Sequence, residues 1–202
     1  MEVKEFRFFT IEDECNLKYE NWSRIYEYPY VFKKLAALGA NSESRIHNTA
    51  WGNVGCHILF KDDLDKIYPY IVHSDTNPPT LSNTMYYDVT EQIDDKFKGL
   101  FDFVLSVCTI NELNFSPVRI IKNLMEHLKI GGHLIMTFDI ADDGHIENVY
   151  HSKPAVDALE LYFRRKMDQG EVEKHLRGSN SKLPIIRWGY LRSGVIVIQR
   201  TA

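Results

Sequence analysis

The stretch FDFVLSVC, Phe101 to Cys108, decides the fold class of this 202-residue chain. Its apolar side chains run almost without interruption, a pattern typical of a central strand in a parallel sheet, where both faces are covered. Parallel strands need a crossover between them, usually a helix. We therefore expect helical and extended patterns to alternate on both sides of this stretch.

The chain after the central strand has this alternation. The segment SPVRIIKNLMEHL has a helical pattern, with Ser116 as the predicted N-cap and a proline at the first helical position. Gly131 and Gly132 are predicted to end the helix, and His133 to Ile140 to form the next strand.

The chain before the central strand alternates as well. Arg45 to His47 is a short strand candidate, GCHILFKDDLDKIY reads as a helix, and YIVHSD is a second strand that ends at Asp75. TMYYDVT is extended and ends near Asp88. Further upstream, NWSRIYEYPYVFKKLAAL has a helical rhythm that Pro29 is expected to kink or split.

The C-terminal end has a different pattern. PIIRWGYL and GVIVIQR are strand-like runs separated only by Arg192, Ser193 and Gly194, and so short a link joins antiparallel strands. The sequence thus predicts an α/β fold: a Rossmann-like, doubly wound, mostly parallel sheet closed by a C-terminal antiparallel β-hairpin.

Composition limits the compartment and the partners. The net charge is −4 with no basic stripe, so no nucleic-acid partner is expected. The three cysteines are far apart in sequence and are read as reduced, which favours the cytoplasm. The N-terminus lacks a signal-peptide pattern, and no apolar run approaches the ~18 residues of a membrane span. We expect a soluble cytoplasmic protein, and its oligomeric state stays open.

The predicted strand ends define the expected site. In an open α/β sheet, ligands bind beyond the carboxyl ends of the strands at the switch point, and the loop HNTAWGNVGCH follows the first strand there. Asp75 lies 23 residues after Gly52, the spacing of an acidic residue that binds two ribose hydroxyls. For Asp75 and Asp88 alike, an Asx turn is the structural alternative.

The loop itself does not suit a dinucleotide. It lacks the GxGxxG pattern, and Trp51 would crowd a pyrophosphate. S-adenosylmethionine carries an adenosine without phosphates, and a helix N-terminus behind the loop could help hold its carboxylate. A purely structural turn is the alternative.

Four motifs resemble the class I S-adenosylmethionine-dependent methyltransferases: VHSDTNP, MYYDVTE, FDFVLSVCTINEL and NLMEHLKIGGHLIMTFD. The family usually has (D/E)xGxGxG in the opening loop, whereas this chain has Asn48 near the acidic position and Ala50 at one glycine, followed by Gly52 and Gly55. The resemblance implies S-adenosylmethionine as cofactor, and the altered loop implies weakened binding.

The length and the order of elements predict one domain, 1–202, with an N-terminal helical segment (1–40), a cofactor-binding core (41–140) and a substrate-side segment with the closing hairpin (141–202). The resemblance, which covers about Tyr30 to Ile140, selects residues within it. The implied cofactor-binding residues are Asn48, Ala50, Trp51, Gly52, Gly55, Asp75, Asp88, Val89, Ser106 and Val107.

Methyl transfer from a sulfonium is an in-line displacement, so the protein mainly aligns donor and acceptor. An oxygen acceptor would benefit from a general base. The candidates beyond the strand ends are Glu112, Asp139, His145 and His151. Asp139, Asp142, Asp143 and His145 are also residue types that bind divalent ions, but an exposed turn explains DDG better, and no metal is predicted.

The acceptor is not encoded in a recognisable motif. The segment from Ala141 to Leu183 is too short for a large substrate domain, which favours a small molecule or a sugar, methylated at oxygen. Two other functions stay open: a noncatalytic methyltransferase-like binding module, which the altered loop favours, and a nucleotide-dependent oxidoreductase, which the missing GxGxxG disfavours.

Overall fold

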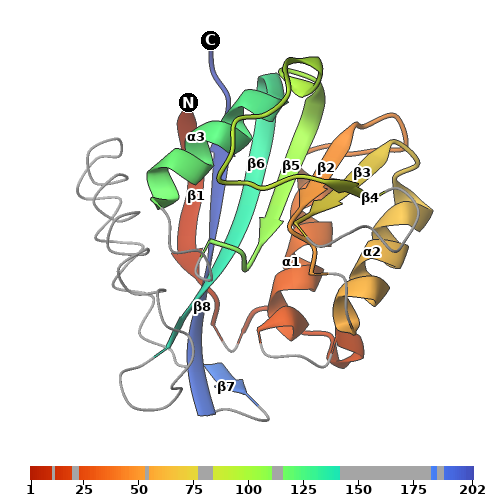
Figure 1. Cartoon of the computed structure of the whole chain (residues 1–202). Helices are drawn as coiled ribbons and strands as arrows, with labels where there is room; N and C mark the ends of the chain where they lie inside the picture. The colour runs from red at the N-terminus through yellow and green to blue at the C-terminus, as the bar shows by residue number, and fades with distance from the viewer. Residues whose placement is uncertain are drawn as a thin grey trace.

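The computed structural model describes residues 1–10, 12–19, 23–52, 55–76, 84–110, 116–141, 183–185 and 189–202 (Figure 1). These residues form one eight-stranded sheet with the order β1-β8-β6-β5-β2-β3-β4, and β7 pairs with β8. The strands are β1 (Glu2–Phe8), β2 (Ile46–Thr49), β3 (Ile71–Asp75), β4 (Thr84–Tyr86), β5 (Phe101–Val107), β6 (Leu128–Ala141), β7 (Leu183–Ile185) and β8 (Gly189–Gln199).

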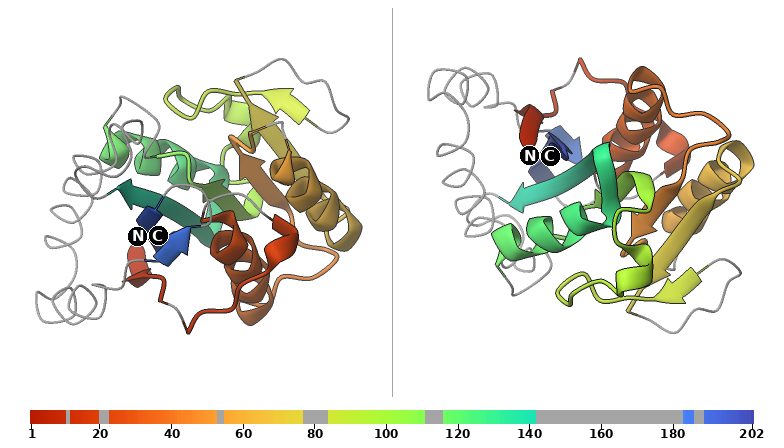
Figure 2. Two further views of the ribbon diagram at one scale, coloured as in Figure 1. Left: turned by 90° about the horizontal axis from the view of Figure 1, so that it is seen from below. Right: turned by 90° about the horizontal axis from the view of Figure 1, so that it is seen from above.

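Helices cover both faces of the sheet (Figure 2). They are α1 (Arg24–Ala37), α2 (Cys56–Ile67) and α3 (Pro117–His127), with 3-10 turns η1 (Leu17–Tyr19) and η2 (Asp95–Phe97). Phe103 and Leu105 of β5 pack with α1 and α2, whereas Val104 packs with α3. Because alternate residues of a strand point to opposite faces, the near-continuous apolar run of β5 fills both cores.

The strand directions confirm the predicted, mostly parallel sheet. β2 pairs in parallel with β3 and with β5, β3 with β4, and β5 with β6, whereas β8 is antiparallel to β6. The strand order reverses between β2 and β5, which makes the space beyond their carboxyl ends the switch point of the sheet.

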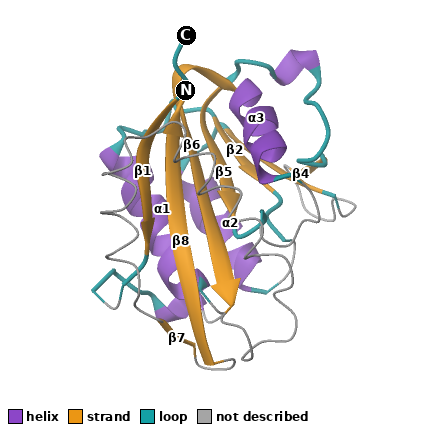
Figure 3. Ribbon diagram, turned by 90° about the vertical axis from the view of Figure 1, so that its left-hand side faces the viewer, coloured by secondary structure: helices purple, strands orange, loops and turns teal. Residues whose placement is uncertain are grey.

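The closing antiparallel strand is present, but its predicted turn at Arg192 to Gly194 is wrong. These residues lie inside β8, which forms its hairpin with the short β7 and is flanked along the rest of its length by β1 (Figure 3). Gly194 faces an aromatic ring, because a Cβ there would lie 2.3 Å from Phe138 Cζ. The glycine therefore accommodates Phe138 and does not form a turn.

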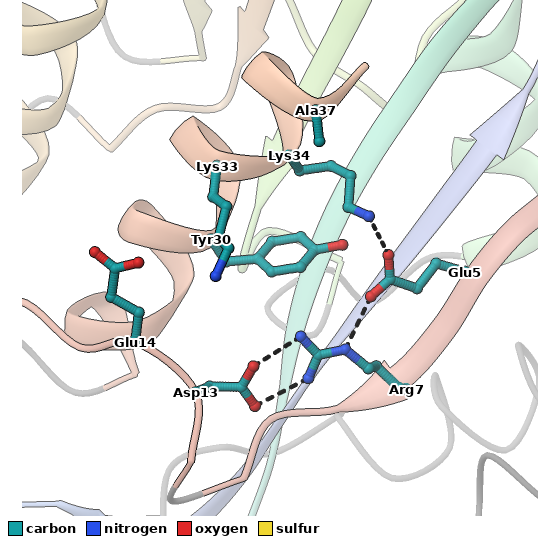
Figure 4. A pocket seen from close by; sticks show the side chains of 8 residues that line it. All are labelled: Glu5, Arg7, Asp13, Glu14, Tyr30, Lys33, Lys34 and Ala37. Carbon is teal, nitrogen blue, oxygen red and sulfur yellow. Dashed lines mark hydrogen bonds and ion pairs between the residues drawn. The ribbon is translucent and has the colours of Figure 1, made fainter.

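The prediction of a helical segment over residues 1–40 holds for α1 and is wrong for the first residues, which form β1. Phe6 is fully buried on the α3 face, and its ring centroid lies 6.2 Å from that of Phe138. Two charged side chains of β1 face the other way. Glu5 lies 2.5 Å from Lys34 of α1, and Arg7 binds both carboxylate oxygens of Asp13, in the segment before α1, at 2.8 and 2.9 Å (Figure 4).

Two sequence signals for breaks lie inside regular elements. Pro29 lies within α1 and has no N–H for the Ile25 carbonyl, which instead accepts a bond of 2.8 Å from the Asn16 backbone N–H. Gly131 and Gly132 lie within β6, because α3 ends at His127 and the strand starts directly after it. The prediction that these glycines end the helix is therefore wrong.

The position of β1 in the core yields a test. We expect Phe6→Ala to lower the free energy of unfolding by about 3–5 kcal/mol, because it removes a fully buried ring. Lys4→Ala, an exposed position on the same strand, is the matched control and should change it by less than about 0.5 kcal/mol. Urea denaturation measures both; equal midpoints for the two variants would contradict the assignment of β1 to the core.

Candidate functional site

A cavity of about 380 Å³ lies at the switch point. Its wall is formed at the carboxyl ends of β2, β3 and β5, together with residues of α1 and α2. The lining residues are Arg24, Tyr28, Asn48, Ala50, Trp51, Gly52, His57, Phe60, Asp75, Thr76, Tyr87, Asp88, Val89, Val107, Cys108 and Thr109. The volume falls within the range of about 300–1,000 Å³ typical of small-molecule and cofactor sites.

Most of the residues selected from the sequence meet at this cavity. Its lining includes Asn48, Ala50, Trp51, Gly52, Asp75, Asp88, Val89 and Val107. Gly55 and Ser106 are not in it. Gly55 is the N-cap of α2, at φ 54°, and Ser106 is fully buried within β5.

Asp75 and Gly52 join the ends of two neighbouring strands. The Gly52 N–H donates to Asp75 Oδ2 at 2.9 Å, so this carboxylate bonds across the site rather than only to its own loop. Gly52 has φ 90°, and a Cβ there would lie 2.8 Å from His57 Cδ2. Both the backbone conformation and the packing of His57 therefore require a glycine at this point of the loop.

Two residues with side chains adopt left-handed backbone conformations at the switch point. Ala50, directly after β2, has φ 49°, and Cys108, directly after β5, has φ 51°. The Cys108 N–H donates to the carbonyl and to Oγ1 of Thr137 in β6, both at 3.1 Å, which holds this conformation. Such residues cost about 1–3 kcal/mol each and occur preferentially at functional sites.

The cavity wall also contains a cation and a histidine that the sequence did not single out, Arg24 and His57. Arg24 is buried near the start of α1 and lies 2.5 Å from the fully buried Glu27. Tyr28 hydrogen-bonds to His57 Nδ1 of α2. Burial, aided by the positive charge of Arg24, lowers the pKa of His57 to about 4 and keeps its ring neutral at neutral pH. The sequence holds one indication for Arg24: it is four residues before Tyr28 in the predicted helix, so the two side chains share one helix face.

Asp88 and Trp51 each make structural contacts and also line the cavity. Asp88 Oδ1 accepts bonds from Thr90 N–H at 2.8 Å and Thr90 Oγ1 at 2.7 Å, the expected local turn, yet the residue lines the cavity. Trp51 is also in the wall, and it packs edge-on against His73 with Lys61 Nζ 6.0 Å from its ring.

The predicted catalytic bases fall largely outside the described residues. This applies to Glu112, His145 and His151, and also to Asp142 and Asp143 of the candidate metal turn. Asp139 lies in β6 opposite Ser193 of β8, at the end of the strand nearer the cavity. Among the described residues, no group of three or more His, Cys, Asp or Glu side chains could hold a metal ion.

His47, beside the predicted ligand loop, lies in the core with His127 and does not line the cavity. Their Nδ1 atoms are 2.9 Å apart, His47 Nε2 bonds to Ser74 Oγ at 2.8 Å, and His127 Nε2 bonds to the Tyr87 hydroxyl at 3.1 Å. Burial lowers the pKa of His47 well below its usual value and that of His127 to about 3. Both rings are therefore neutral in the folded protein at neutral pH.

These depressed values make stability depend on pH. In the unfolded chain a histidine has a pKa of about 6.5, so below that pH the unfolded state binds protons that the folded state does not. We expect the free energy of unfolding to fall on acidification from about pH 6.5 to about pH 5, by up to about 1.4 kcal/mol per pH unit for each buried histidine.

This pH window lies above the usual pKa values of carboxylates, about 4, so the titration of the histidines can be distinguished from that of the acidic groups. Urea denaturation at a series of pH values measures the slope, and His127→Gln should make it shallower. A stability that is constant over this window, or that rises on acidification, would contradict the buried neutral pair.

No family model and no curated protein matches the sequence. Solved structures do match the fold. A structure from Bacillus halodurans C-125, described as a candidate methyltransferase, is 10% identical over 84% of this chain and 98% of its own, with a TM-score of 0.52. The 1,6-didemethyltoxoflavin-N1-methyltransferase of Burkholderia thailandensis, solved with 1,6-didemethyltoxoflavin and S-adenosylhomocysteine, is 12% identical over 86% of this chain and 77% of its own, with a TM-score of 0.53.

The fold is that of the S-adenosylmethionine-dependent methyltransferases. A third example is phosphoethanolamine N-methyltransferase 2 of Haemonchus contortus, solved with S-adenosyl-L-methionine, at 13% identity over 86% of this chain and a TM-score of 0.50. This chain spans 53% of that protein's length. At these identities the likeness is one of fold. In the described part of this methyltransferase fold, no helix is long and apolar enough to cross a membrane.

Proposed function

We propose that this protein transfers a methyl group from S-adenosylmethionine to a small-molecule or sugar acceptor, at oxygen. The observation that carries the proposal is the switch-point cavity in which Asp75, held by the Gly52 N–H, lines the wall with Asp88. The position of this cavity at the switch point supports the proposal, because an open α/β sheet binds its ligand there.

The acidic groups suit a nucleoside better than a nucleotide. Asp75 accepts a bond from the Gly52 N–H, and a carboxylate, with about four acceptor sites, is a group that can accept from the two hydroxyls of a ribose. The negative charges of Asp75 and Asp88 would repel a pyrophosphate. Trp51 adds bulk directly before the glycine that a phosphate would need to approach. These features favour a ligand without phosphates.

Arg24 is the cation suited to the amino-acid end of this cofactor. It lines the cavity from α1, where its Nη1 contacts Glu27 and the Ser23 hydroxyl. A planar guanidinium binds a carboxylate well. The cavity thus offers acceptors for hydroxyls and a donor group for a carboxylate.

The cofactor supplies an already activated methyl group on a sulfonium, so the chain's own residues have to align the acceptor and receive its proton. Asp139, Glu112, His145 and His151 are proposed as candidates for the base, without a metal ion. The acceptor class is supported by the small-molecule substrate of the Burkholderia thailandensis enzyme with this fold. The free cysteines, Cys15, Cys56 and Cys108, are compatible with a cytoplasmic location.

A ligand-binding experiment tests the cofactor. We expect S-adenosylmethionine and S-adenosylhomocysteine to raise the melting temperature, because a ligand at ~100 times its dissociation constant stabilises the folded state by about 2.7 kcal/mol. NADH should have no effect. A shift with NADH alone would favour an oxidoreductase, and no shift with any of the three would favour a noncatalytic module.

The same titration locates the site through Asp75→Asn. The amide keeps one acceptor for the Gly52 N–H but loses charge and acceptor sites, so we expect at least about tenfold weaker binding of S-adenosylhomocysteine, or about 1.4 kcal/mol. Asp62→Asn, which removes an exposed charge on α2, is the control. Wild-type affinity in Asp75→Asn would show that the ligand binds elsewhere.

A further inference from the structure

A chain of polar side chains leads from α2, over the face of the sheet that this helix covers, to the cavity. Lys61 Nζ lies 2.6 Å from Asp65 Oδ2, Asp65 Oδ1 lies 2.9 Å from His73 Nε2, and His73 Nδ1 lies 3.1 Å from Asn48 Nδ2. Only Asn48, at the far end, lines the cavity. His73 is fully buried, and Asp65 is partly exposed on α2.

The chemistry of Asp65 fixes the direction of every bond in this chain. An ionised carboxylate can only accept, so His73 donates from Nε2. Burial lowers the pKa of His73 although Asp65 opposes this, so the ring is neutral at neutral pH and Nδ1 carries a lone pair. That lone pair accepts from the Asn48 amide nitrogen. The Asn48 carbonyl oxygen, which bonds to none of the described residues, is then the atom left for the cavity.

We infer that Asp65 and His73 are positioning residues that hold Asn48 with its carbonyl oxygen toward the cavity, where it accepts a hydrogen bond from a ligand amino group. The inference rests on the proposed function, in which that amino group belongs to the amino-acid end of the cofactor. A neutral acceptor with a fixed orientation thus replaces a carboxylate at this point of the loop.

The arrangement makes binding sensitive to acid. A protonated His73 would donate from Nδ1 as well, and only the Asn48 oxygen could accept that bond. The amide would turn, and its N–H groups would face the cavity and repel an ammonium group. The charged or titratable groups around His73 are Asp65, Lys61 and Asp62 of α2 and His47 of β2. Because the pKa of His73 is lowered, we expect affinity for an amino-bearing ligand to fall only on acidification to a pH below the usual histidine value of about 6.5.

Two probes separate the amino group from the rest of the ligand. S-adenosylhomocysteine carries the amino-acid end, whereas 5′-methylthioadenosine has the same nucleoside and sulfur without it. Isothermal titration calorimetry of the full chain measures both. We expect His73→Leu to weaken S-adenosylhomocysteine at least about tenfold, because Asn48 loses the acceptor that orients it, and to leave 5′-methylthioadenosine within about twofold.

Conservative and control variants complete the design. His73→Asn offers an amide oxygen in place of Nδ1, so it should retain most of the affinity and lose the fall in affinity on acidification. Asp65→Ala, at a partly exposed position, tests the first link if His73→Leu does not fold. Asp62→Asn removes a charge near His73 without touching the chain of bonds and should bind as wild type does.

The outcomes distinguish the inference from the proposed function. If neither probe binds the wild-type protein, the proposed function fails and the inference fails with it. Suppose that both probes bind the wild type. If His73→Leu then weakens the binding of both probes equally, or of neither probe, the proposed function stands and the positioning role is overturned. A selective loss of S-adenosylhomocysteine binding, relieved in His73→Asn, supports the role.

Discussion

The parallel pairing of β2 with both β3 and β5 is the constraint on which the site depends. It brings three carboxyl ends to one edge of the sheet, and the reversal of strand order between β2 and β5 leaves space between the loops that follow them. The bond from Gly52 to Asp75 then connects two of these ends. The cavity therefore follows from topology, and the side chains decide its chemistry.

Polar groups buried beside β2 link stability to that chemistry. His47 and Asn48 are adjacent but point to opposite faces, so one joins the core pair with His127 and the other joins His73. Buried polar atoms need partners, since an unsatisfied one costs about 1–3 kcal/mol. On the face of α2, the bonds that satisfy His73 also orient Asn48 at the cavity, so a single set of contacts stabilises the sheet and prepares the site.

The sequence was sufficient for features set by local pattern. The apolar run of β5 and the strand that ends at Asp75 are where hydrophobic patterning predicts them, and the loop after β2 lines the cavity. Local pattern did not predict the features that depend on contacts between distant parts of the chain. The strand β1 depends on pairing with β8, nearly 200 residues away, and the glycine at position 194 is required by the Phe138 ring that packs against it. Arg24 reaches the cavity only because α1 packs on the sheet.

A crystal structure of the protein with S-adenosylhomocysteine tests the central claim most directly. We expect the nucleoside in the switch-point cavity, with both ribose hydroxyls on Asp75 and the amino group within hydrogen-bonding distance of the Asn48 carbonyl oxygen. Ligand bound at any other surface would contradict the assignment of the cofactor site to this cavity. A ligand in this cavity whose ribose makes no contact with Asp75 would contradict the role proposed for Asp75.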